Sequence, residues 1–144
     1  MAVGGKLTKK RALLWVVLSA AVIVGLIALR WYAGRDNLST LEGRLRFISS
    51  LGWEADAASE THQGVLIPDT LDGVMAEYNT MQLEQGYDLN RHLGERCEQY
   101  SYVLTNYPDS ATVYITLYVQ GRTLIAGDIH TASINGFMHG IERR

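Results

Sequence analysis

The chain has 144 residues and a formal net charge of −2, but its charges are distributed unevenly. Residues 1–35 carry six of the 13 basic residues and no acid, whereas residues 36–144 carry all 15 acids and the other seven bases. Affinity for nucleic acid comes mainly from Lys and Arg that neutralise phosphates, so this acidic part argues against nucleic-acid binding. The single cysteine, Cys97, excludes an internal disulfide and a zinc site built from cysteines, and we expect it to be a small buried hydrophobic residue.

Residues 12–29 form an uncharged run of 18 residues, which would span roughly 27 Å as a helix. Four basic residues precede the run, and Trp31 and Tyr32 follow it, as aromatic residues often do at a membrane interface. A cleaved signal peptide has a shorter apolar core and small residues before the cut, but here the bulky Trp31 or Tyr32 precedes the candidate cut sites. An uncleaved anchor is therefore the favoured interpretation, and a cleaved signal peptide or a buried helix of a soluble protein is the alternative.

This interpretation divides the chain into three parts. Residues 1–11 are expected to be a cytoplasmic basic tail, residues 12–33 a single-pass transmembrane helix in the lipid bilayer, and residues 34–144 an extracytoplasmic domain. Ala21 and Gly25 are small residues four apart, a spacing that allows two such helices to approach closely. A weak homodimer through this pair is a further expectation.

Two helices are predicted in the domain that follows. Ser39 and Glu42 have the spacing of a capping box for a helix at 40–51, which Gly52 ends. After a polar loop, residues 65–67 are predicted to be a short strand. Asp69 is then predicted to cap a second helix that ends at Gly86. Its apolar stripe is Leu71, Val74, Met75, Tyr78 and Met81.

From Cys97 onward the hydrophobic pattern has a period of two, which is typical of strands. Strands are predicted at 97–105, 111–119 and 122–130, the last two joined by a two-residue hairpin loop at 120–121.

That loop would pair Leu117 with Leu124 and Ile115 with Ala126, so that their side chains share one face. The predicted fold class is α+β: a transmembrane helix, then a small domain in which two helices pack on one face of an antiparallel β-meander of three to four strands.

Six short segments of the domain form a distinctive ordered set. They are GWE at 52–54, VLIPDTLDGV at 65–74, EYNTMQLEQGYDL at 77–89, YSYVLTNYP at 100–108, GRTLIAGD at 121–128 and GFMHG at 136–140. In this set the chain resembles, over roughly residues 40–141, a bacterial domain-of-unknown-function family, the one numbered 4830. The resemblance implies one domain behind a single N-terminal hydrophobic segment. It implies no activity, cofactor or catalytic residue, because the family has none established.

No catalytic or metal-binding motif is evident. Asp128 and His130 are two apart on a predicted strand and point to the same side, but a zinc site needs three or four ligands. The chain contains no H-E-x-x-H, G-x-S-x-G or S-x-x-K pattern. We therefore expect no cofactor, assign no catalytic residue, and interpret the histidines as solvated or singly hydrogen-bonded.

The tyrosines suggest a binding surface instead. Tyr114, Thr116 and Tyr118 are predicted to face away from the Ile115 and Leu117 side of their strand and to be exposed. Tyrosine offers apolar area and a hydroxyl at low entropy cost, which suits it to binding sites. The alternative is that a loop or the C-terminal tail covers this face.

Two hypotheses follow for the function. The first is a non-enzymatic, membrane-anchored extracytoplasmic domain that binds a protein partner or a cell-envelope component. The second is an envelope hydrolase that uses carboxylates or an Asp128–His130 site.

Overall fold

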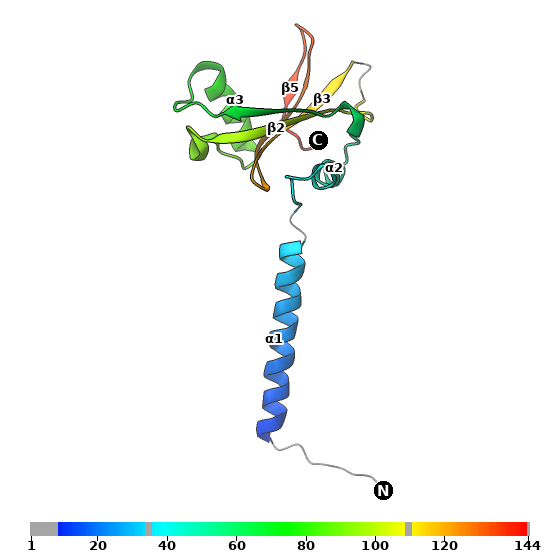
Figure 1. Cartoon of the computed structure of the whole chain (residues 1–144), viewed down its shortest axis with the longest axis vertical. Coiled ribbons are helices and arrows are strands. Elements are labelled where there is room, and N and C mark those ends of the chain that lie inside the picture. Colours follow the sequence, from blue (N-terminus) through cyan, green and yellow to red (C-terminus); the bar gives the residue numbers. More distant parts are fainter. Residues whose placement is uncertain (1–8, 34–35, 109–110, 144) are drawn as a thin grey trace. The chain divides into compact units, whose positions relative to one another are not determined.

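The computed structural model describes residues 9–33, 36–108 and 111–143, and for residues 9–12 and 30–33 it describes the backbone alone. The chain divides into two units, residues 1–35 and 36–144. The first unit contains α1 (Lys9–Ala33), a continuous helix (Figure 1). Its side chains from Leu13 to Leu29 are exposed. Among the residues that the structure describes, no helix is long and apolar enough to cross a membrane.

The sequence predictions for the N-terminal unit fall partly outside the described residues. Most of the expected cytoplasmic tail, residues 1–8, lies outside them, whereas the expected transmembrane segment at 12–33 lies within α1. Ala21 and Gly25 are in the exposed part of α1, and a Cβ added at Gly25 would meet no atom within 4 Å.

The second unit is an α+β domain, as predicted. Its sheet is antiparallel throughout, with the strands in chain order from β1 to β5, so the predicted meander is confirmed. The sheet contains five strands, however, and the predicted three to four is wrong. The elements are α2 (Leu41–Ser50), η1 (Ala57–Ser59), β1 (Thr61–Leu66), α3 (Gly73–Glu84), η2 (Leu89–His92), β2 (Arg96–Val103), β3 (Val113–Gln120), β4 (Thr123–Thr131) and β5 (Met138–His139).

The start of α2 differs by one residue from the predicted capping box. Thr40, not Ser39, is the N-cap, and its hydroxyl accepts a hydrogen bond from the Gly43 N–H at 3.1 Å. The Ser39 backbone N–H and hydroxyl instead both donate to the Asn37 side chain, at 3.2 Å and 2.7 Å. Gly43 is required here, since a Cβ at this position would lie 2.0 Å from the Asn37 carbonyl oxygen.

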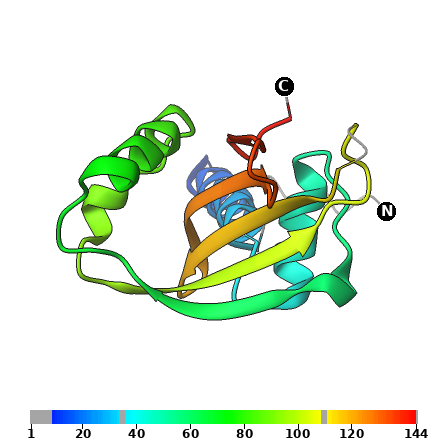
Figure 2. The ribbon, with the colours of Figure 1, turned by 90° about the horizontal axis from the view of Figure 1, so that it is seen from above.

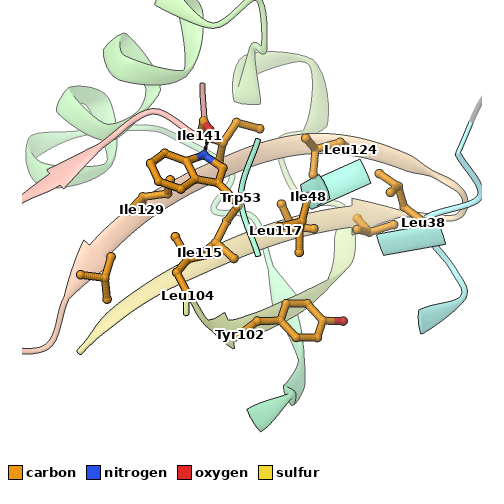
Figure 3. Close-up of a cluster of buried hydrophobic side chains, with 12 residues drawn as sticks. Leu38, Ile48, Trp53, Tyr102, Leu104, Ile115, Leu117, Leu124, Ile129 and Ile141 are labelled. Carbon is orange, nitrogen blue, oxygen red and sulfur yellow. Dashed lines mark hydrogen bonds between the residues drawn. The ribbon is translucent and has the colours of Figure 1, made fainter. Parts of the chain in front are cut away.

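The two faces of the sheet bury separate clusters. On the first face, called the α2 face, Ile48 of α2 and Trp53 pack against alternate residues of β2, β3 and β4 (Figure 3). Trp53 is fixed there by a hydrogen bond from its Nε1 to the Ile141 carbonyl at 2.7 Å. The strand residues of this cluster are Tyr102, Leu104, Val113, Ile115, Leu117, Val119, Leu124 and Ile129.

On the opposite face, called the α3 face, a smaller cluster forms around Cys97 and Ala126, with Met75 and Tyr78 of α3 packed against it. Cys97 is 3% exposed, which confirms the prediction that it is a buried hydrophobic residue. The prediction that both helices cover one face is wrong. The residues of β3 that alternate with those of the α2 face are also shielded from water, and α3 packs on the opposite face, where they lie. Figure 2 shows α3, in green, standing apart from α2, in cyan.

The β3–β4 hairpin differs from the predicted register. Its turn is at residues 121–122, with Gly121 at φ +60°, and Leu117 pairs with Gly127 rather than with Leu124. An irregularity at Tyr118 and Val119 places Ala126 opposite Tyr118, so Ala126 lies on the α3 face and not beside Ile115. A single additional residue in one strand reverses the facing of every residue after it.

One strand, β5, escaped prediction, and the predicted strand at 65–67 captured only the end of β1. β1 occupies residues that were assigned mainly to a loop, and most of its side chains are exposed and polar. β5 is only two residues long. The second helix begins later than predicted: Asp72, not Asp69, is the N-cap residue of α3, and this leaves Val74 80% exposed instead of in the core.

Candidate functional site

The position of α3 depends on one buried glutamine. Gln82 is fully buried, and its Nε2 donates to the Gly127 carbonyl at 3.0 Å while its Oε1 accepts from the Gly127 N–H at 2.9 Å. On this side of β4, β5 pairs only with Ile129 and His130, so the edge at Gly127 has no neighbouring strand. The side-chain amide of Gln82 makes the hydrogen bonds that a neighbouring strand would make there. This pairing holds α3 against the α3 face of the sheet.

A groove of about 640 Å³ lies between α3 and the sheet. α3 supplies a mainly apolar wall, β2 to β4 supply a floor that is largely polar, and residues 65–68 and Met138 form the rim. Two large apolar side chains at this groove are well exposed, Val74 at 80% and Met138 at 53%; Leu66, which lines the rim, is 57% exposed. A cluster of exposed apolar side chains around a concave site is a feature of surfaces that bind a partner or ligand.

The floor of the groove contains a buried carboxylate with two partners. Asp128 is 2% exposed, its Oδ2 accepts a hydrogen bond from the Tyr78 hydroxyl at 2.7 Å, and its Oδ1 is 2.7 Å from His130 Nδ1. The His130 ring also stacks on Tyr114, with centroids 5.7 Å apart. These contacts fix the orientation of the imidazole, whose side chain keeps 29% of its surface exposed.

The protonation of these groups follows from their contacts. The hydrogen bond and charge of Asp128 raise the pKa of His130, and they outweigh burial, which lowers it. Burial and the Asp128 charge raise the pKa of Tyr118 to about 12 and raise the pKa of Tyr78 as well. Both phenols are therefore neutral at physiological pH, and the floor presents hydroxyl groups and one imidazole rather than phenolates.

The predicted metal pair, Asp128 and His130, contact each other. Within residues 36–108 and 111–143, no group of three or more His, Cys, Asp or Glu side chains is arranged to hold a metal ion. Both carboxylate oxygens of Asp128 already have protein partners. Burial raises the pKa of the Cys97 thiol, which disfavours the nucleophilic thiolate form.

The three predicted binding residues lie in different environments. Thr116 and Tyr118 line the groove, and Tyr114 lies beside it under His130. The prediction of an exposed Tyr–Thr stripe is wrong at Thr116, which is 1% exposed and hydrogen-bonds the Ser101 hydroxyl at 2.7 Å. Tyr118 is only partly exposed because Tyr78 of α3 packs against it edge to face, with ring centroids 6.1 Å apart.

Sequence reasoning placed Val74 and Tyr78 on the apolar stripe of a helix, which is the usual pattern of a core contact. It did not indicate that the stripe would form one wall of an open groove. The sequence did not indicate that Gln82 is buried either, because a glutamine in an amphipathic helix is normally solvated. The polar partner of Gln82 is a backbone group on a strand 45 residues away.

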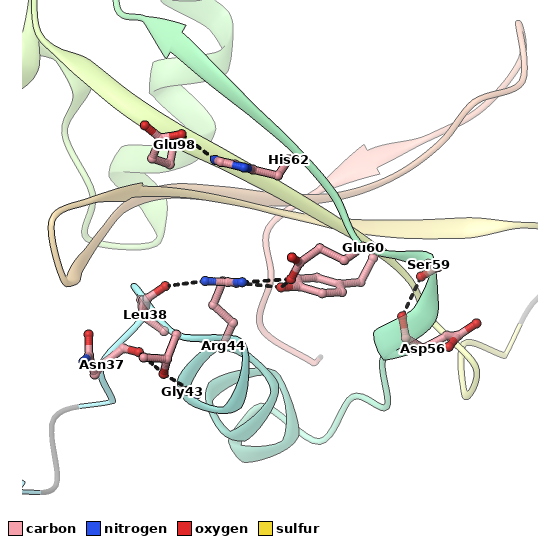
Figure 4. A network of polar contacts seen from close by, with 11 residues as sticks. Asn37, Leu38, Gly43, Arg44, Asp56, Ser59, Glu60, His62 and Glu98 are labelled. Carbon is pink, nitrogen blue, oxygen red and sulfur yellow. Dashed lines mark hydrogen bonds and ion pairs between the residues drawn. The ribbon is translucent and has the colours of Figure 1, made fainter.

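A second polar network, on the α2 face, is internal to the domain. Arg44 is 4% exposed and donates to the Leu38 carbonyl at 3.0 Å, to the Tyr102 hydroxyl at 2.6 Å and to Glu60 at 2.8 Å (Figure 4). Burial raises the pKa of Glu60, but hydrogen bonds from Tyr102 and Arg44 outweigh this and lower it overall. This network ties α2 to the sheet.

Comparisons with known protein families, with curated proteins and with solved structures find no match for this chain. The resemblance to family 4830 therefore stays a prediction.

Proposed function

We propose that this chain is a membrane-anchored, extracytoplasmic binding domain, whose groove receives an apolar part of a protein partner or of a cell-envelope component. The anchor is proposed from the sequence of residues 12–33: an uncharged run, basic residues before it, and Trp31 and Tyr32 after it. α1 is helical over this range.

The observation that carries the binding proposal is the exposure of Val74 and Met138 at one groove. Leaving these side chains in water is unfavourable, by about 25 cal/mol for each Å² of apolar surface that could be buried. Methionine side chains are flexible and polarisable, so Met138 and the neighbouring Met81 can adapt to the shape of a ligand. A partner that covers the groove would remove this surface from water.

The test compares the tagged, full-length chain with two variants after isolation from its own membranes in mild detergent. Val74→Asp places a charge at the groove, whereas Ser50→Asp places the same charge on α2, an exposed position outside the groove. Burying an unpaired carboxylate in an apolar contact is costly, so Val74→Asp should reduce at least one co-isolated protein or lipid by about tenfold or more. Ser50→Asp should retain it, as measured by quantitative mass spectrometry. Equal recovery of the partner with both variants would show that the groove is not the binding site.

The alternative function, an envelope hydrolase, is favoured by the Asp128–His130 contact. A carboxylate that orients a histidine through Nδ1 is the arrangement that lets Nε2 act as a general base. This alternative predicts that a panel of ester substrates is hydrolysed by the wild type and not by His130→Gln. The binding proposal predicts no hydrolysis that depends on His130.

A further inference from the structure

The strand at one edge of the sheet, β1, has a free side. β1 pairs with β2 alone, over six residues from Thr61 to Leu66. The outer side of an edge strand presents backbone N–H and C=O groups that can pair with another strand. Which residues of β1 present these groups can be derived from the hydrogen bonds of its neighbours.

In an antiparallel pair, residues alternate between those that bond to the partner strand and those whose backbone groups point away from it. Leu104 N–H donates to the Val113 carbonyl, so Leu104 and every second residue before it along β2 point toward β3. The residues between them point toward β1, and their partners are Thr61, Gln63 and Val65. The bond from Ile67 N–H to the Glu95 carbonyl continues this alternation.

The other three residues, His62, Gly64 and Leu66, therefore direct their backbone groups outward. In the part of the chain that the structure describes, none of these groups has a hydrogen-bond partner. Together they form a row of three donors and three acceptors in the spacing of a strand edge.

Nothing in the sequence of this edge blocks pairing. Natural edge strands are protected by lysine, proline or a bulge, but β1 contains neither residue and pairs with β2 in regular register. A Cβ added at Gly64 would meet no atom within 4 Å, so the face of the sheet over the middle of the strand is open.

The free edge is continuous with the groove. Residues 65–68, at the end of β1, form part of the groove rim, and Val65 packs against the cluster on the α3 face. Side chains of a strand point alternately to the two faces of its sheet. A strand added outside β1 would therefore direct every second side chain toward the α3 face and its groove.

The acidic side chain closest to the middle of this edge is Glu98, and the basic Arg96 lies two residues from it, opposite Leu66 at the end of β1. Glu98 lies opposite Gly64, its side chain is 50% exposed, and it contacts His62 at 2.5 Å (Figure 4). Residues 36–144 as a whole carry 15 acidic and seven basic side chains. A partner segment with Arg or Lys at the positions between its apolar residues would place positive charge on the same face of the sheet as Glu98, with β1 between them.

We infer that β1 is a docking edge for an extended segment of a protein partner, which adds to the sheet as a sixth strand. Its apolar side chains occupy alternate positions on the groove side, and its basic side chains lie on the Glu98 side. A row of backbone donors and acceptors selects a polypeptide, because lipids and sugars do not reproduce the spacing of a strand. This inference rests on the proposed function and names the class of partner.

The experiment selects peptides from a displayed random library against the full-length chain in lipid nanodiscs, with counter-selection on empty nanodiscs. We expect enriched peptides with alternating apolar and basic residues. Gly64→Pro, which removes an outward N–H that the fold does not use, should weaken their binding by about tenfold or more. Gly64→Ala is the matched control, which keeps the N–H and should bind nearly as the wild type does. Glu98→Gln should weaken binding, more at low than at high salt.

Hydrogen exchange on the wild-type chain gives a second readout that does not depend on the folding of a variant. A selected peptide should slow exchange of the amides of His62, Gly64 and Leu66. No enriched peptide, peptides that bind as helices, or binding without this protection would overturn the inference. Protection that increases with protein concentration in the absence of peptide would identify a second copy of the chain as the occupant and would also overturn it. Loss of partners in Val74→Asp but not in Gly64→Pro would leave the groove function standing and remove strand addition.

Discussion

The replacement of Gln82 by alanine tests how the groove is assembled. Gln82 makes two hydrogen bonds to the backbone of Gly127 across the open edge of β4, and it is fully buried. Each such bond contributes about 0.5–1.5 kcal/mol net, and a buried donor left without a partner costs about 1–3 kcal/mol. The Gly127 carbonyl keeps one partner, Gln85 Nε2 at 3.1 Å, so the N–H alone is orphaned. We therefore expect Gln82→Ala to lower the free energy of unfolding by about 2–4 kcal/mol.

The assay is denaturant unfolding of the full-length chain, with the buried Trp53 as one fluorescent reporter, together with hydrogen exchange at the Gly127 amide. Thr80→Ala is the control, since Thr80 is exposed on the same helix and should change stability by no more than about 0.5 kcal/mol. A loss below about 1 kcal/mol in Gln82→Ala, or unchanged exchange at Gly127, would refute the argument that this amide completes the edge of β4.

Three further predictions concern stability. The pKa of His130 is raised in the folded state, so its contribution to folding stability is complete below the ordinary pKa of 6.5 and is lost as pH rises through the raised pKa. The free energy of unfolding measured from pH 5 to 9 should show this loss, and Asp128→Asn should abolish it. The pKa of Glu60 is lowered in the folded state, so its contribution to folding stability is present above the ordinary pKa of 4.5 and is lost as pH falls through the lowered pKa. Glu60→Gln should remove this acid dependence and cost about 2 kcal/mol, because Arg44 would remain buried without its counter-charge; a flat acid limb in the wild type would contradict this. Gly43→Ala should lower the unfolding midpoint in a thermal melt, because its Cβ would overlap the Asn37 carbonyl, and an unchanged midpoint would show that α2 adjusts freely.

The meander from β2 to β4 could be predicted because its hydrophobic alternation is strong. Val113, Ile115, Leu117 and Val119 all lie in the larger core, as a period of two requires. The exact pairing could not be predicted, because it depends on a turn at 121–122 and on one irregularity next to Val119. Neither feature changes the hydrophobic pattern, and together they move the partner of Leu117 by three residues, from Leu124 to Gly127.

The groove could be predicted only in part. Thr116, Tyr118, Asp128 and His130 were recognised as candidates because their types and spacing on strands suggest a polar face. The wall of the groove required knowledge of where α3 packs, and this depends on the long-range pairing of Gln82 with the backbone of Gly127. The predicted strand at 65–67 captured only the last residues of β1, because an edge strand that buries little carries no hydrophobic period.

The central claim is that the groove is a contact surface for a partner outside the cytoplasm. The most direct measurement places a photoreactive amino acid at Val74 or, as a control, at Ser50 of the full-length chain in intact cells, followed by irradiation. Val74 and Ser50 are both exposed, so a substitution at either position is compatible with folding. The account predicts a discrete cross-linked product from position 74, accessible to protease added from outside, and none of the same mass from position 50. The same product from both positions, or none from position 74, would contradict it.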